Sequence, residues 1–167
     1  MEINYCIRYM RESEITLLEN FLFEAFYVPH GSQPFSRDII YKPEHVIYYK
    51  NFYSLKDDIA FVAEVDKRIV GCVWVRVMND YGHISDEYPS LNISVHKEFH
   101  RRGIGYALME AMINELKKRK YPGVSLSVQT ENYATELYKK LGFEIYEDKG
   151  NEWIMLLRFV YPKDWSP

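Results

Sequence analysis

The chain has 167 residues, of which 47% are hydrophobic and 27% charged, and its formal net charge is −3. These values predict one globular domain, residues 1–167, with a sizeable core, and they argue against bulk electrostatic binding of nucleic acid. The sequence has no apolar run near the roughly 18 residues of a membrane span, no signal-peptide pattern at its start, and two cysteines, Cys6 and Cys72. We therefore expect a cytoplasmic protein with neither nucleic acid nor a membrane as its partner.

The first third of the chain is rich in aromatic residues and predicts a strand followed by helices. Residues Ile3 to Tyr9 predict the strand, and Glu12 to Tyr27 carry apolar residues at helical spacing. Residues Ser36 to Tyr53 are expected to be partly helical, with an interruption at Pro43. The aromatic run from Tyr41 to Tyr53 could line a pocket or pack two helices together, and the sequence leaves both open.

The middle of the chain predicts strands. Residues Ile59 to Val65 and Ile69 to Met78 are two strand candidates joined by a short turn, and Leu91 to Val95 is a third after the polar loop Asn79 to Glu87. On the second strand, alternation separates two sets of side chains: Val73, Val75 and Val77 on one face, and Cys72, Trp74 and Arg76 on the other.

The last part of the chain alternates helices and strands. Residues Ile104 to Arg119 predict a long helix, Val124 to Gln129 a strand, and Asn132 to Gly142 a short capped helix. Residues Phe143 to Tyr146 and Trp153 to Val160 would form a final pair of strands. The long helix has one apolar stripe: Ile104, Ala107, Leu108, Ala111, Met112 and Leu116. This order predicts the α/β class, with a mixed sheet covered by helices.

The run from His100 to Gly105 is the strongest functional signal in the sequence. A strand, a basic turn with two glycines and a helix start form an arrangement that suits a pyrophosphate, because free N–H groups and the helix dipole favour an anion there. Arg101 and Arg102 add positive charge. A Rossmann site would need a third glycine and a P-loop would need Gly-Lys-Ser/Thr, and both patterns are absent. Taken alone, the run could also be a helix start with solvated arginines.

Two motifs make residues 91 to 143 resemble the acyl-CoA core of the GNAT superfamily of N-acetyltransferases. The first runs from Leu91 to Leu108, with His100 where the family usually has Gln or Arg. The second comprises Asn132, Ala134, Leu137-Tyr138 and Leu141-Gly142-Phe143. The resemblance implies a mixed, mostly antiparallel central sheet flanked by helices. It also implies acetyl-CoA as the cofactor.

The resemblance also implies which residues hold the cofactor. The strand around Ile93 to Val95 would part from its neighbour and pair with the pantetheine arm, so that an N–H near Val95 faces the thioester oxygen. The cofactor-binding residues implied are Ile93, Ser94, Val95, His100, Arg101, Arg102, Gly103, Ile104, Gly105, Tyr106, Asn132 and Tyr138. No cluster of Cys and His has metal-binding spacing, so we expect no metal site.

Several residues are candidates for proton transfer. Tyr138 falls at the family's general-acid position, although a tyrosine beside Leu137 and Leu141 could equally belong to the core. Glu87 and Asp86, just before the cofactor strand, could deprotonate the amine through water or be surface bystanders, and so could His83 on the same loop. Relatives that acetylate protein N-termini often carry a glutamate in the strand after the long helix, and Ser127 stands there in this chain.

The function implied is transfer of an acetyl group from acetyl-CoA to a primary amine of a small molecule or peptide, by direct attack in a ternary complex. The alternative is a non-catalytic acyl-CoA-binding regulatory module, which would bind acetyl-CoA without turnover. A structural interaction domain would bind no CoA at all. The identity of the amine and the base stays open, and a homodimer is one of the states that the sequence allows.

Overall fold

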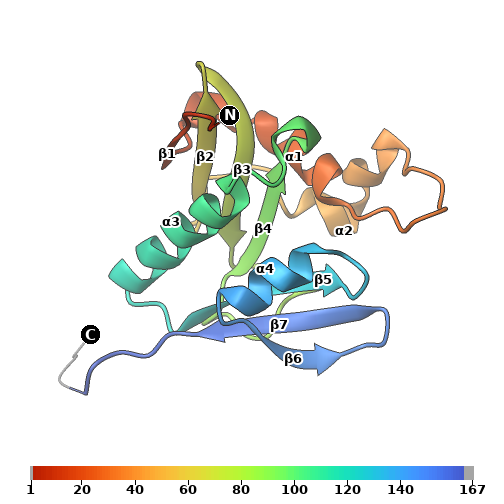
Figure 1. The fold of residues 1–167 in the computed structure, drawn as a ribbon. Helices are drawn as coiled ribbons and strands as arrows, with labels where there is room; N and C mark the ends of the chain where they lie inside the picture. Colours follow the sequence, from red (N-terminus) through yellow and green to blue (C-terminus); the bar gives the residue numbers. More distant parts are fainter. Residues whose placement is uncertain (1, 164–167) are drawn as a thin grey trace.

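A seven-stranded sheet forms the centre of the computed structural model, which describes residues 2–163 (Figure 1). The strands are β1 (Cys6–Tyr9), β2 (Ile59–Val65), β3 (Arg68–Arg76), β4 (Ser90–Val95), β5 (Gly123–Gln129), β6 (Glu144–Asp148) and β7 (Glu152–Arg158). Their order across the sheet is β1-β2-β3-β4-β5-β7-β6. Within the described part, β4 and β5 run parallel and every other pair is antiparallel, which confirms the predicted mixed, mostly antiparallel sheet.

Helices cover both faces of this sheet. The helices α3 (Ile104–Lys118) and α4 (Ala134–Lys140) lie on one face, in front of the sheet in Figure 1. The other face is covered by α1 (Leu17–Ala25) and the short 3₁₀ helix η2 (Arg37–Tyr41). The 3₁₀ helix η1 (Glu12–Glu14) precedes α1, and α2 (Pro43–Val46) packs against η2. A further 3₁₀ helix, η3 (Lys97–Phe99), follows β4. None of the helices in residues 2–163 is long and apolar enough to cross a membrane.

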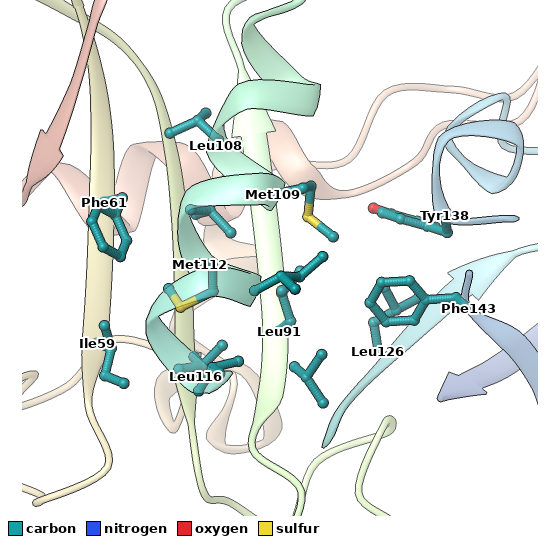
Figure 2. Packing of buried hydrophobic residues seen from close by; sticks show 14 of the residues in the cluster. Ile59, Phe61, Leu91, Leu108, Met109, Met112, Leu116, Leu126, Tyr138 and Phe143 are labelled. Atoms are coloured by element: carbon teal, nitrogen blue, oxygen red, sulfur yellow. The ribbon is translucent and has the colours of Figure 1, made fainter. Parts of the chain in front are cut away.

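The alternation predicted along β3 divides the core into two layers. Val73 and Val75 pack with α3, whereas Cys72 and Trp74 pack with α1 on the opposite face. The stripe on α3 is rotated slightly from the predicted one: Ile104, Leu108, Met109, Met112, Ile113 and Leu116 are buried. Figure 2 shows four of these side chains, Leu108, Met109, Met112 and Leu116, directed toward β2, β3 and β4. The sheet therefore has a separate hydrophobic layer on each side.

The first predicted helix is shorter in the structure than in the sequence prediction. Glu14 accepts hydrogen bonds from the backbone N–H of Arg11 at 2.8 Å and from the Arg8 guanidinium at 2.8 Å. These bonds close a separate 3₁₀ turn at residues 12–14, and α1 begins only at Leu17. The carboxylate that helical spacing would place on the outer surface instead ties the turn to β1.

The segment that precedes β2 folds as short turns rather than as one helix. Pro43 stands at the first position of α2, where its missing N–H has no cost, and the helix ends at Val46. Asn51 and Tyr53 have φ values of 53° and 70°, which a continuing helix excludes. Packing is the main role of the aromatic run: the Tyr49 hydroxyl donates to the Ile40 carbonyl and the Tyr53 hydroxyl donates to the Met10 carbonyl.

Arg76, at the end of β3, holds this segment against the sheet. Its guanidinium donates to both carboxylate oxygens of Asp58 at 2.9 Å and to the backbone carbonyls of Ile47, Lys50 and Asn51. The two charged side chains are 6% and 0% exposed. A turn-rich segment leaves carbonyls without secondary-structure partners, and a single forked cation satisfies three of them here.

We predict that Asp58→Asn destabilises the fold by about 3–5 kcal/mol, because it leaves the Arg76 charge buried without its counterion. The measurement is the free energy of unfolding in urea. The matched control is Glu98→Gln, which breaks the exposed pair between Glu98 and Arg68 and should leave the unfolding curve almost unchanged. Equal small effects of both variants would show that the buried pair does not hold the segment.

Candidate active site

A cleft of about 940 Å³ opens where β4 and β5 part. In the described residues the two strands are paired at one position, Ser90 with Ser125, and the Ser125 N–H donates to the Pro89 carbonyl at 3.0 Å. Beyond this point the strands separate, and residues of both line the cleft. Figure 1 shows β4 directed away from β5 toward the top of the molecule. This geometry agrees with the parted strand that the family resemblance implies.

The closed end of the cleft is fastened by the loop between β3 and β4. Ser125 donates through its hydroxyl to the Gly82 carbonyl at 2.8 Å, and Ser90 donates to the Asp80 carboxylate at 2.7 Å. A side chain at Gly82 would lie 3.0 Å from the backbone nitrogen of Ser127, so glycine permits the loop to press on β5. Each parted strand is therefore bonded to the loop through a serine.

The two parted strands present different chemistry to the two sides of the cleft. Leu91, Leu126 and Val128 belong to the hydrophobic layer under α3 and α4. Because side chains alternate along a strand, Asn92 and Ser127 face the side of α1 and α2. The Asn92 amide nitrogen is buried and has no partner among the described residues. The cleft thus has an apolar side and a polar side.

The basic glycine turn lies at the α3/α4 side of the cleft. Arg101 and Gly103 both have left-handed backbones, with φ values of 60° and 80°. Gly103 is the N-cap of α3, and no side chain caps this helix, so its first N–H groups are free to meet an anion. Arg101 and Arg102 are exposed, and within residues 2–163 neither makes an ion pair. The free N–H groups, the left-handed backbone and the two arginines make this turn suitable for an anion.

His100 joins the cofactor turn to the start of α4. Its Nε2 lies 2.7 Å from the Val95 carbonyl and its Nδ1 lies 2.9 Å from the Tyr133 hydroxyl. A carbonyl only accepts, so Nε2 carries the proton, and Tyr133 donates to Nδ1 in the neutral ring. The sequence indicated only that His100 departs from the family's usual residue. The bridge that its side chain makes was not predictable, because the partner, Tyr133, lies 33 residues later in the chain.

Asn132 has a structural role as well as a place in the cleft. Its side-chain oxygen accepts a hydrogen bond from the Ala134 N–H at 2.9 Å and so starts α4. The amide nitrogen stays available, and the residue lines the cleft. The helix starts near Asn132, as predicted, but its N-cap residue is Tyr133, and the Asn132 side chain bonds the first turn from one position earlier. A cofactor contact from Asn132 stays a prediction.

Tyr138 extends from α4 toward β4, with its hydroxyl directed to the side of Met109 (Figure 2). The ring is 7% exposed and packs against Phe143 with a centroid separation of 5.8 Å. Burial raises the pKa of the phenol well above its usual range, so the group keeps its proton at neutral pH. Its hydroxyl makes no hydrogen bond to any residue in the described range 2–163, and the residue lines the cleft. Tyr138 therefore combines a core ring with a proton donor at the cleft.

Aromatic side chains wall the opposite side, toward α1 and α2. His45 packs edge-on against Phe26 at 4.8 Å and lies 6.3 Å from Tyr81, both measured between ring centroids. Tyr48 lines the same wall, and its hydroxyl is paired with Asp80. Burial raises the pKa of Asp80, whereas hydrogen bonds from Ser90 and Tyr48 act in the opposite direction. The wall is a mostly apolar surface with one imidazole in it.

Most of the predicted site residues come together at the cleft. Those that line it are Ile93, Ser94, Val95, His100, Arg101, Gly103, Gly105, Tyr106, Asn132 and Tyr138. Three do not: Arg102 is exposed beside the turn, Ile104 is 1% exposed in the core, and Glu87 is exposed on the β3–β4 loop. Glu87 lies outside because the polar loop presents it to solvent, while Asp80 and Gly82 of the same loop are turned inward.

Solved structures similar to this one share its fold. The ribosomal-protein-S18-alanine N-acetyltransferase from Escherichia coli has a TM-score of 0.65 at 20% identity, over 98% of this chain and 99% of that chain. The PaiA N-acetyltransferase from Thermoplasma acidophilum, in complex with coenzyme A, has a TM-score of 0.70 at 17% identity, over 94% of this chain and 100% of that chain. The fold is that of the acyl-CoA N-acyltransferases.

The sequence comparisons agree with this fold. The family model described as an acetyltransferase (GNAT) domain matches residues 56–145, and the chain belongs to that family. An N-alpha-acetyltransferase of Sulfurisphaera tokodaii is 35% identical over 113 residues, or 61% of this chain and 67% of that protein. The [ribosomal protein bS18]-alanine N-acetyltransferase of Escherichia coli is 41% identical over 61 residues, but this match spans only 36% of this chain and 41% of that protein.

The two glycines of the turn should respond differently to alanine. Gly103→Ala places a side chain on a left-handed backbone and should cost about 1–2 kcal/mol of folding free energy. At Gly105 the added carbon would meet Leu137 at 3.7 Å, an ordinary contact, on a helical backbone. Gly105→Ala should therefore be neutral or stabilising by up to about 1 kcal/mol. Urea denaturation of both variants measures the difference, and equal effects would contradict the distinction.

Proposed function

We propose that this protein transfers an acetyl group from acetyl-CoA to a primary amine of a small molecule or peptide. The observation that carries the proposal is a cleft with an uncapped, basic helix start on one side and a protonated, unpartnered tyrosine beside it. Family membership supports acetyl transfer, and related folds have been solved with coenzyme A or acetyl-CoA. The two cysteines are free thiols, which supports a cytoplasmic location.

The donor would enter from the α3/α4 side. The first N–H groups of α3, together with Arg101 and Arg102, would hold the pyrophosphate. The pantetheine arm would lie along β4, whose backbone groups facing β5 lose their strand partner beyond Ser90. An N–H near Val95 would then stabilise the oxyanion that forms on the thioester carbonyl. Binding thus uses backbone groups that the parted strands leave free.

The amine would approach from the α1/α2 side and attack through the gap. Tyr138 would donate its proton to the departing sulfur, since its phenol is protonated at neutral pH and its hydroxyl has no competing partner among residues 2–163. A lysine-type amine costs about 4.6 kcal/mol to deprotonate at pH 7, whereas an α-amine costs only about 1 kcal/mol. Glu87 is no longer our candidate for this step, because it is exposed and does not line the cleft.

The basic test is release of CoA thiol from acetyl-CoA in the presence of a panel of primary amines. Turnover with any amine supports transfer. Binding without turnover would leave a non-catalytic acyl-CoA-binding module. No acetyl-CoA binding at high micromolar concentration would overturn the whole proposal.

Gly105→Asp should weaken acetyl-CoA binding by at least about tenfold while the fold stays intact. The new carboxylate lies near the pyrophosphate site, but the backbone there is helical and has room for a side chain. An acidic residue in the first turn of α3 is also favourable for the helix. Calorimetry with acetyl-CoA measures the effect.

Gly105→Ala is the control for this variant, because it adds the same carbon without the charge. It should keep nearly wild-type affinity. Equal affinity of the aspartate and alanine variants would place the pyrophosphate somewhere else.

Tyr138→Phe should lower kcat by at least about tenfold, since general acids contribute roughly 10²–10⁴-fold. The ring keeps its packing against Phe143, so the melting temperature and acetyl-CoA affinity should change little. The measurement is steady-state kinetics with an amine that the wild type accepts.

Tyr49→Phe removes a hydroxyl that bonds the Ile40 carbonyl and serves as the matched control, with activity expected near wild type. A fully active Tyr138→Phe enzyme would assign Tyr138 to the core alone.

A further inference from the structure

We propose that His45 is the general base that takes a proton from the acceptor ammonium, an inference that rests on the proposed acetyl transfer. The need for a base follows from the strand β5, where Ser127 lines the cleft without offering a carboxylate. Residues on the α1/α2 side must supply it, because the amine arrives there. His45 is the imidazole in that wall.

The tautomer of His45 is defined by its surroundings. Nδ1 lies 2.7 Å from the Ile39 carbonyl, which only accepts, so Nδ1 carries the proton of the neutral ring. The lone pair is therefore on Nε2. An imidazole held in this way is a proton acceptor with a defined direction.

The Nε2 atom is open to the cleft. It has no hydrogen-bond partner in residues 2–163. The buried side-chain nitrogens and oxygens without a partner in this range are Asn92 Nδ2 and Trp153 Nε1, so His45 Nε2 is not sealed from solvent. The side chain is only 7% exposed, and it lines the cleft. Phe26 packs against one side of the ring and Tyr81 lies on another, so few orientations are available to it.

Two carboxylates near this wall, those of Glu24 and Asp80, are already engaged. Glu24 accepts from His96 at 2.7 Å through one oxygen and from Asn20 at 3.2 Å through the other. Asp80 accepts from Ser90 and is paired with Tyr48. Glu152 lines the cleft from β7, opposite Gln129 at the end of β5. The phenol ring nearest to the imidazole is that of Tyr81.

The proton balance of the step is complete with these groups. His45 Nε2 accepts one N–H proton of the ammonium and later releases it to water. The freed lone pair forms the C–N bond at the thioester carbon, and the C–S bond breaks with its electron pair on sulfur. Tyr138 protonates that sulfur, and the second proton of the nitrogen restores the phenol, directly or through water. One amide, one thiol and one proton are produced.

The variant His45→Asn separates this role from a structural one. Its amide N–H can replace Nδ1 in the bond to the Ile39 carbonyl, but nothing replaces the basic Nε2. The two acceptors to compare are 2-phenylethylamine and O-benzylhydroxylamine, which have the same shape. The first is an ammonium ion at neutral pH and the second is already an uncharged amine, and both suit the aromatic wall.

With 2-phenylethylamine, His45→Asn should lower kcat/KM by at least about a hundredfold. With O-benzylhydroxylamine, the loss should stay below about threefold, because no proton has to be removed before attack. Glu152→Gln is the control for a cleft carboxylate and should leave both values near wild type. If Glu152→Gln lowered kcat/KM with 2-phenylethylamine but not with O-benzylhydroxylamine, the base would be Glu152 and the proposal would be overturned.

Equal losses with both acceptors in His45→Asn would also overturn it, since a structural role does not distinguish them. Full activity of the variant would do the same. Turnover of O-benzylhydroxylamine by the wild type tests acetyl transfer alone, because this acceptor needs no base before it attacks. Turnover of this acceptor but loss of the predicted difference therefore rejects only His45, whereas no turnover of either acceptor or of any other amine in the panel rejects the proposed function as well.

Discussion

The parting of β4 from β5 is the constraint on which the rest of the structure depends. Two parallel neighbours in the middle of a sheet would normally satisfy each other along their length, but here a single residue pair, Ser90 and Ser125, holds them. Serine hydroxyls on both strands tie this point to the β3–β4 loop. A sheet that closed here would have no cleft, and a sheet without this fastening would separate into two halves.

The parted strands also explain why the protein needs a different layer on each face. On the α3/α4 side, Leu126 and Val128 continue the apolar core, and Tyr138 adds one phenol to it. On the α1/α2 side, the polar positions of the same strands meet a wall of aromatic residues with His45 in it. The cleft therefore connects the basic turn at the start of α3 to a mostly apolar wall with one imidazole in it. In the proposed reaction, acetyl-CoA and the amine would meet between the parts of β4 and β5 that are not paired with each other.

That aromatic wall depends on a segment with little secondary structure of its own. Between α2 and β2 the chain folds as short turns, and three of its carbonyls, those of Ile47, Lys50 and Asn51, accept hydrogen bonds from Arg76 of β3. The buried pair of Arg76 and Asp58 thus acts on the site from a distance, because it holds the turns that carry His45 and Tyr48. A change at the Arg76 guanidinium should therefore affect both the stability of the fold and the shape of the cleft.

Much of this was determined by the sequence itself. Local patterns indicated the strands β2, β3 and β4, the long helix α3, the helix start near Asn132 and the glycine turn, because hydrophobic period and turn chemistry are properties of neighbouring residues. Tertiary structure decided the rest. Glu14 shortened the first helix by bonding Arg8, Glu87 faced solvent while Asp80 turned inward, and His45 met Phe26 and Tyr81. Each of these outcomes depends on contacts between separate elements of the fold or on the direction in which a loop side chain points, and the hydrophobic period and turn chemistry of one segment specify neither.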